Sequence, residues 1–140
     1  MTHPQIVVTG AVGAERRISA AAMAAVPDTV ADAASVAAGA VGRAVRVASL
    51  IDQAAPNQDA THCTVISSGG YRASIPLGDL AAGGWLTFGD GDGPLPEDKG
   101  GPFRLTVAQG STLCWNVKQV AMLRLTAGPE PDDVPENPPH

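Results

Sequence analysis

Alternation of apolar and polar residues is the clearest pattern along this chain, and it predicts strands. In residues 103–108 the apolar side chains of Phe103, Leu105 and Val107 fall on one face of an extended chain. Arg104 and Thr106 fall on the opposite face, as expected for a strand with one buried side. Comparable alternation, or a short β-branched run closed by turn residues, predicts further strands over residues 5–10, 15–19, 61–68, 71–75, 85–90 and 121–127.

Capping residues and prolines mark a few short helices between these strands. Ser19 is placed to cap a helix over residues 20–26, because a serine hydroxyl can accept from the first free backbone N–H groups. Pro27 then ends that helix. The sequence predicts a second short helix over residues 47–54 and a helical turn over residues 77–81.

Composition agrees with a single small domain rich in turns. The chain has 140 residues, of which 44% are hydrophobic but only 4% aromatic, so its core is built mainly from small aliphatic side chains. It contains 16 glycines and 12 prolines, and Gly69 and Gly70 make the turn of a predicted hairpin. Helices are too few for a doubly wound parallel sheet, so a compact α+β domain with mixed or mainly antiparallel sheets is predicted.

The net charge argues against two classes of binding partner. The net charge of −5 disfavours binding to nucleic acid or to an anionic membrane surface. No apolar run is long enough to span a bilayer, and residues 1–10 do not read as a secretory signal, so we expect a cytoplasmic protein. Residues 128–140 are acidic and proline-rich; we expect a mobile or extended tail after a domain over residues 1–127, with a partner-binding peptide as the alternative.

Isolated metal-like patterns favour structural roles. Asp90 and Asp92 supply two carboxylates in a glycine-rich turn, fewer than a calcium loop needs. His62 and Cys63 are neighbours in a predicted strand, so their side chains point to opposite faces. Cys63 and Cys114 both sit among apolar residues, which favours buried free thiols. No metal site is predicted.

Several segments, taken in order, are shared with a known family. They read IVVTGAV, AVRVASLIDQA, VISSGGYRASIPL, GDGPLPEDKGGPFRLTVA and NVKQVAMLRL. Together, over roughly residues 5 to 126, they resemble the molybdopterin-binding domain of sulfite-oxidase-type oxidoreductases. The PLPEDKGGPFRL segment is the most specific of them. The chain departs from the family pattern at Ala44, where Gly is usual, at Gly69, where Asp is usual, and at Lys99, where His is usual.

The resemblance implies an α+β fold of the sulfite-oxidase type, with strand-rich mixed sheets and two or three short helices. It also bears on residues 30–39, which are ambiguous by themselves. Their alanines favour a helix, whereas their flanks favour a strand. The resemblance favours the strand.

The family's molybdenum ligand is missing from the expected place. In the family a cysteine thiolate binds the metal just before the turn that corresponds here to AVRVASL. The equivalent residues, 32–36, contain no cysteine, and Ser35 is the nearest polar replacement. A hydroxyl is a poor substitute for a soft thiolate. We therefore expect no molybdenum, although molybdopterin itself stays possible by resemblance.

The resemblance also marks residues that would hold a cofactor or ligand. Lys99, Arg104 and Lys118 match positions where the family gathers cations around the pterin phosphate. Ser35 and Tyr71 complete the candidate binding set. For cofactor-free acid–base chemistry in the same cleft, the candidates are Asp32, Tyr71 and Lys118.

Three functions remain open at this point, one of which is a purely structural or oligomerising domain. The first is a domain of this fold, without molybdenum, that binds a small molecule or a protein partner in the former cofactor cleft. The alternative is an enzyme, either a molybdopterin-dependent oxidoreductase or a cofactor-free catalyst. A homodimer is possible in either case.

Overall fold

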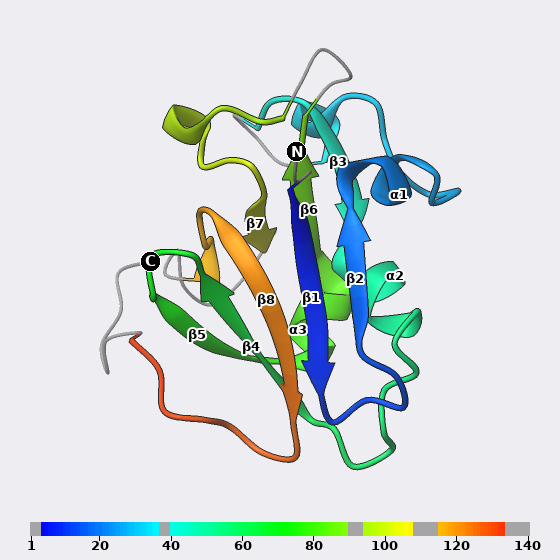
Figure 1. Ribbon diagram of the computed structural model, residues 1–140, viewed down its shortest axis with the longest axis vertical. Helices are drawn as coiled ribbons and strands as arrows, with labels where there is room; N and C mark the ends of the chain where they lie inside the picture. Colours follow the sequence, from blue (N-terminus) through cyan, green and yellow to red (C-terminus); the bar gives the residue numbers. More distant parts are fainter. Residues whose placement is uncertain (1–3, 37–39, 90–93, 108–114, 134–140) are drawn as a thin grey trace.

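Two β-sheets form the frame of the molecule (Figure 1). The computed structural model describes residues 4–36, 40–89, 94–107 and 115–133. The five-stranded sheet has the order β2 (Arg16–Ser19), β1 (Gln5–Gly10), β8 (Val120–Thr126), β4 (His62–Ser67) and β5 (Arg72–Pro76). The three-stranded sheet has the order β3 (Arg43–Arg46), β6 (Gly84–Phe88) and β7 (Arg104–Val107). β1 and β8 are parallel and every other pairing between these strands is antiparallel, so the larger sheet is mixed.

Short helices connect the strands. They are α1 (Ala20–Ala24), α2 (Val47–Asp52) and α3 (Leu77–Gly83), with 3₁₀ turns η1 (Ala33–Ser35) and η2 (Glu97–Lys99). The predicted cap is present, since the Ser19 hydroxyl accepts a hydrogen bond from the Ala22 N–H at 3.2 Å. The α+β prediction, with mixed sheets and a few short helices, is confirmed. No helix in the described part of the chain is long and apolar enough to cross a membrane.

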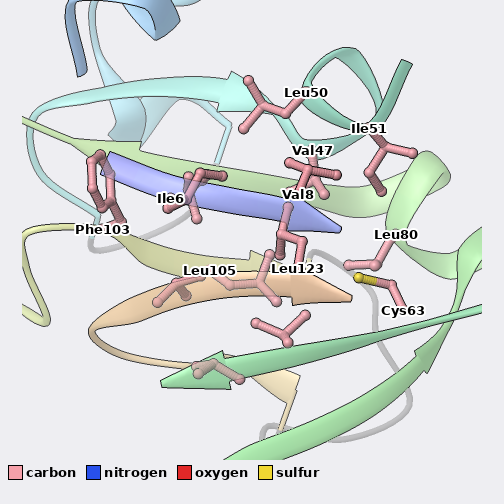
Figure 2. Close-up of a cluster of buried hydrophobic side chains, with 14 of the residues drawn as sticks. Ile6, Val8, Val47, Leu50, Ile51, Cys63, Leu80, Phe103, Leu105 and Leu123 are labelled. Atoms are coloured by element: carbon pink, nitrogen blue, oxygen red, sulfur yellow. The ribbon is translucent and has the colours of Figure 1, made fainter. Parts of the chain in front are cut away.

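The main core lies where the inner faces of the two sheets meet (Figure 2). Ile6 and Val8 of β1 and Leu123 of β8 are fully buried, as is Leu105 of β7. The helices α2 and α3 add further buried aliphatic side chains to the same cluster. Truncating one such side chain, as in Leu105→Ala, typically costs about 2–5 kcal/mol.

A smaller cluster covers the outer face of the three-stranded sheet. Ala44 and Trp85 of that sheet pack with Ala33 of η1. Two cations also lie over aromatic rings of β6, because the Arg46 guanidinium is 4.8 Å from the Trp85 ring centroid and that of Arg43 is 4.9 Å from the Phe88 ring. The packing of Ala33 on Ala44 and Trp85 holds the η1 turn against the small sheet.

The predicted strand over residues 30–39 is wrong. Residues 33–35 form the 3₁₀ turn η1, and Val30 makes only an isolated bridge to Ala44. The cause is local: the Asp32 carboxylate accepts from the Ala34 N–H at 3.1 Å, and the Ser35 hydroxyl donates to the Asp32 carbonyl at 2.7 Å. Such short-range bonds compete with a strand ladder. Residues 37–39 lie outside the described residues.

The first part of the acidic tail is extended and bonded to the five-stranded sheet. The Glu130 carboxylate accepts hydrogen bonds from the Thr64 hydroxyl at 2.7 Å and from Arg124 Nε at 3.0 Å. These two bonds, that of Thr64 first, hold the pKa of Glu130 below its ordinary value. Asp132 and Asp133 continue along β5. Residues 134–140 lie outside the described residues.

The lowered pKa of Glu130 predicts that this attachment weakens in acid. A carboxylate with a depressed pKa stabilises the folded state above its ordinary pKa of 4.5, and the contribution is lost as pH falls through the depressed value. At about pH 7, Glu130→Gln should therefore lower the free energy of unfolding by about 1 kcal/mol or less. As the pH falls through the depressed value the two proteins should converge, as measured by urea denaturation over a series of decreasing pH values. A difference that grows toward acid would contradict this account.

Candidate functional site

Gly100 is the point around which the candidate cations gather. It ends η2 in a left-handed conformation, with φ of +88°. A Cβ added there would lie 2.9 Å from Cδ of Arg104 and 3.1 Å from Cγ of Lys118. Only glycine therefore leaves room for both side-chain stems, and the chain brings two of its predicted phosphate ligands to one place.

Backbone hydrogen bonds tie together the two segments that carry these cations. The Gln119 N–H donates to the Gly100 carbonyl at 2.8 Å, and the Val120 N–H donates to Phe103 O at 2.8 Å. The Leu105 N–H donates in turn to Val117 O at 2.8 Å. Arg104 and Lys118 are thus placed by paired backbone rather than by free loops.

Arg104 carries a buried nitrogen without a partner. Leu105 beside it points into the core, so the Arg104 side chain leaves the opposite face of β7. The Thr87 hydroxyl donates to the Arg104 carbonyl at 3.2 Å, which supports the backbone there. Arg104 Nε is buried and has no hydrogen-bond partner among the described residues. A buried donor of this kind is costly to leave unpaired, and an anion would satisfy it.

Tyr71 and Lys118 share one hollow. The hollow has a volume of about 270 Å³, and its other lining residues are Ser67, Asn116, Val117 and Gln119. The Asn116 side-chain oxygen accepts from the Val107 N–H at 2.9 Å, which ties this wall to the end of β7. The volume is near the lower limit for small-molecule pockets. It suits a small ligand.

Two larger hollows lack this cationic character. One, of about 550 Å³, is lined by prolines, including Pro94, Pro96 and Pro102, together with Glu97. The other, of about 600 Å³, lies between α1 and α2 and carries Asp28 and Asp52. Neither has a Lys or Arg among its described lining residues. The hollow beside Lys118 is therefore the better candidate for an anionic ligand.

The remaining predicted site residues lie elsewhere. Lys99 is exposed on η2, directly before Gly100. Asp32 and Ser35 are exposed on η1, where both are engaged in the local hydrogen bonds of that turn. Asp32, Ser35 and Lys99 are not among the described residues that line the Tyr71 hollow, and neither is Arg104, whose stem meets that of Lys118 at Gly100.

Strand register nevertheless puts η1 and Arg104 on one face of the small sheet. Ala44, Thr87 and Arg104 are opposite one another across β3, β6 and β7. Their side chains therefore share a face, and Ala33 of η1 packs on Ala44. The segment equivalent to the family's metal-binding stretch thus lies over the face that carries Arg104.

Cys63 is held in the core. It is fully buried among apolar side chains of the main cluster, and burial raises the pKa of its thiol to about 12. The thiolate that would bind a metal is therefore strongly disfavoured. Cys114 lies outside the described residues. Within those residues, no group of three or more His, Cys, Asp or Glu side chains is placed to hold a metal ion.

Comparison with known proteins identifies the family. A sequence model of the oxidoreductase molybdopterin binding domain matches residues 5–133. The chain belongs to this family. A search of curated proteins finds no matching relative. Among solved structures, the crystal structure of the sulfane dehydrogenase SoxCD from Paracoccus pantotrophus is similar, with a TM-score of 0.69 and 17% sequence identity over 90% of this chain. The match spans 39% of that longer chain, and at this identity it shows a shared fold.

The described residues fit one part of the family's cofactor and not another. Arg104 and Lys118, set against Gly100, suit a phosphate-like anion. The 32–36 segment offers molybdenum a carboxylate and a hydroxyl instead of a soft thiolate, and Cys63 is committed to the core. No redox step through molybdenum follows from these donors.

Sequence reasoning missed the wall of the hollow. No sequence pattern assigns Asn116 or Gln119 to the hollow, although both lie within two residues of Lys118 in the chain. The NVK segment was a usable signal, because a polar amide next to a matched cation and just before a strand is a common pocket element.

The burial of Cys63 predicts a chemically silent thiol. In the native protein at about pH 8, Cys63 should resist iodoacetamide, and it should react once urea unfolds the chain. Peptide mass spectrometry locates the label and separates Cys63 from Cys114. Labelling of native Cys63 at the rate of a free cysteine would show that this part of the core opens readily.

Proposed function

We propose that this chain is a member of the molybdopterin-binding-domain family that binds a small anionic molecule and holds no molybdenum. The observation that carries the proposal is the buried, unpartnered Nε of Arg104, whose side-chain stem meets that of Lys118 at Gly100. An anion accepting from both groups would satisfy the buried donor and bring the two cations together without repulsion.

The hollow narrows the class of ligand. Lys118 lines it while Arg104 does not, and its volume of about 270 Å³ favours a small ligand over a large cofactor. Tyr71 adds an aromatic ring and a polar tip at the edge. The chain carries a net charge of −5, so a local cation pair is what would draw an anion to this place. A small phosphorylated or carboxylated molecule is the ligand class that we favour.

An enzyme using the same hollow is the second candidate. Tyr71 and Lys118 line it together, and each can hold or move a proton. Asp32, the third predicted catalytic residue, caps η1. Acid–base chemistry here would therefore rest on Tyr71 and Lys118, whose replacement by Phe and Met would separate catalysis from binding once a substrate is known.

The first test measures the molybdenum content of the protein. The protein should be purified from a host that makes the molybdenum cofactor, and its molybdenum measured by mass spectrometry. We expect far less than one atom per chain, because residues 32–36 supply no thiolate. Stoichiometric molybdenum would overturn the metal-free part of the proposal.

The second test is anion binding. Calorimetric titration with inorganic pyrophosphate at low ionic strength should detect binding, and Arg104→Gln should weaken it about tenfold or more, since a charge-assisted hydrogen bond contributes about 1.5–3 kcal/mol. Arg17→Gln, on exposed β2, is the matched control and should bind as wild type. Equal affinity of wild type and Arg104→Gln would remove Arg104 from the site.

A further inference from the structure

The outer edge of β5 carries the first part of the acidic tail. β5 is the last strand of the five-stranded sheet, so only its β4 side is paired within the sheet. In an antiparallel strand the N–H groups point alternately to the two sides. Those of Arg72 and Ser74 point outward, as their hydrogen bonds to the tail show. Those of Ala73 and Ile75 therefore face β4.

The tail fills this edge with carboxylates. One oxygen of Asp133 accepts from the Arg72 N–H at 2.9 Å, and one oxygen of Asp132 accepts from the Ser74 N–H at 2.6 Å. The Asp133 N–H donates back to the Arg72 carbonyl at 2.9 Å. The tail therefore covers the edge mainly by side-chain acceptors rather than by an added strand.

Basic and hydroxyl groups on the sheet face also bind the tail. Glu130 reaches Thr64 and Arg124, and its N–H donates to the Ser74 hydroxyl at 3.1 Å. Arg72 also lies 3.6 Å from Asp133. We call this surface the edge groove: the outward side of Arg72 and Ser74, with Thr64 and Arg124. Its chemistry selects an extended chain that carries several carboxylates.

The tail is held weakly enough for another acidic segment to replace it. Pro129 and Pro131 are exposed, so the tail buries little apolar surface. The ion pair between Arg72 and Asp133 has side chains that are 44% and 43% exposed, and such pairs contribute little net stability. The tail leaves β8 through Gly128, which has φ of +111° and open space around it. Its N–H donates to the Thr61 hydroxyl at 2.7 Å and its carbonyl accepts from the Thr126 hydroxyl at 2.6 Å, so exchange involves the part of the tail that follows Gly128.

We propose that the edge groove is a docking site for an extended acidic segment of another protein, and that Glu130–Asp133 is its built-in competitor. The segment it fits carries two adjacent carboxylates for the N–H groups of Arg72 and Ser74. A further carboxylate two residues earlier meets Thr64 and Arg124, as Glu130 does. Because the tail is tethered, its effective concentration is high, and a partner binds only when it outcompetes the tail.

The test uses full-length protein and a synthetic peptide. The probe is the capped peptide of residues 127–133, AGPEPDD, and its control has Ala at both Asp positions. The protein is the Asp132→Ala, Asp133→Ala double variant, which keeps the groove and loses the two competitor carboxylates that bind the Arg72 and Ser74 N–H groups. Asp52→Ala, Asp59→Ala is the charge-matched control, because both residues are exposed and distant in sequence from the tail.

Amide hydrogen exchange and resonance shifts, both measured by NMR, report the loss of the tail contact and the binding of the peptide. In the double variant the amides of Arg72 and Ser74 should exchange at least tenfold faster than in wild type, while those of Ala73 and Ile75 stay protected and report an intact sheet. Millimolar AGPEPDD should shift the Arg72 and Ser74 resonances saturably and restore protection. The alanine peptide should cause neither effect. Wild-type protein should need at least tenfold more AGPEPDD than the double variant for the same resonance shifts. Glu130→Gln, titrated in parallel, tests the groove should the double variant fail to fold.

Three results would overturn the proposal. In the first, Arg72 and Ser74 do not respond to AGPEPDD in either tail variant although the sheet is intact. In the second, the alanine peptide acts as well as the acidic one, which removes the role of the carboxylates. In the third, light scattering shows wild type as a dimer and the double variant as a monomer, which makes the occupant the tail of a second copy.

Discussion

Burial of the inner faces of the two sheets against each other is the interaction on which the rest of the structure depends. Ile6, Val8 and Leu123 of the larger sheet and Leu105 of the smaller one are fully buried in the same cluster. Because Leu105 must point inward, Arg104 must leave the other face of β7. The position of the candidate ligand-binding cation is therefore a consequence of core packing.

The candidate site is assembled by backbone pairing between segments on either side of residues 108–114. Hydrogen bonds from Gln119 to Gly100 and from Val120 to Phe103 bring the segment of Lys118 alongside that of Arg104. Gly100 leaves the space that both stems use. The shared PLPEDKGGPFRL segment thus has a physical role, since its glycines and prolines shape a turn that two cations approach.

Membership of the molybdopterin-binding-domain family and the chemistry of the site are separate matters here. The family match and the similar structure rest on the whole arrangement of strands and turns. Residues 32–36, whose Ala33 packs on the face of the small sheet that also carries Arg104, contain no thiol. A fold of this kind says where a ligand would lie, and individual donors decide which ligand it is.

The sequence by itself determined most of the strands, the Ser19 cap and the family, because alternation, caps and turn residues act over a few neighbouring positions. It misjudged residues 30–36, where the hydrogen bonds of Asp32 and Ser35 outcompeted a ladder. The family resemblance grouped Arg104 with Lys118, but the sequence showed neither that their stems meet at Gly100 nor that Asp132 and Asp133 bind the edge of β5. Both depend on which strands become neighbours and which edge stays free, and only packing of the whole chain decides that.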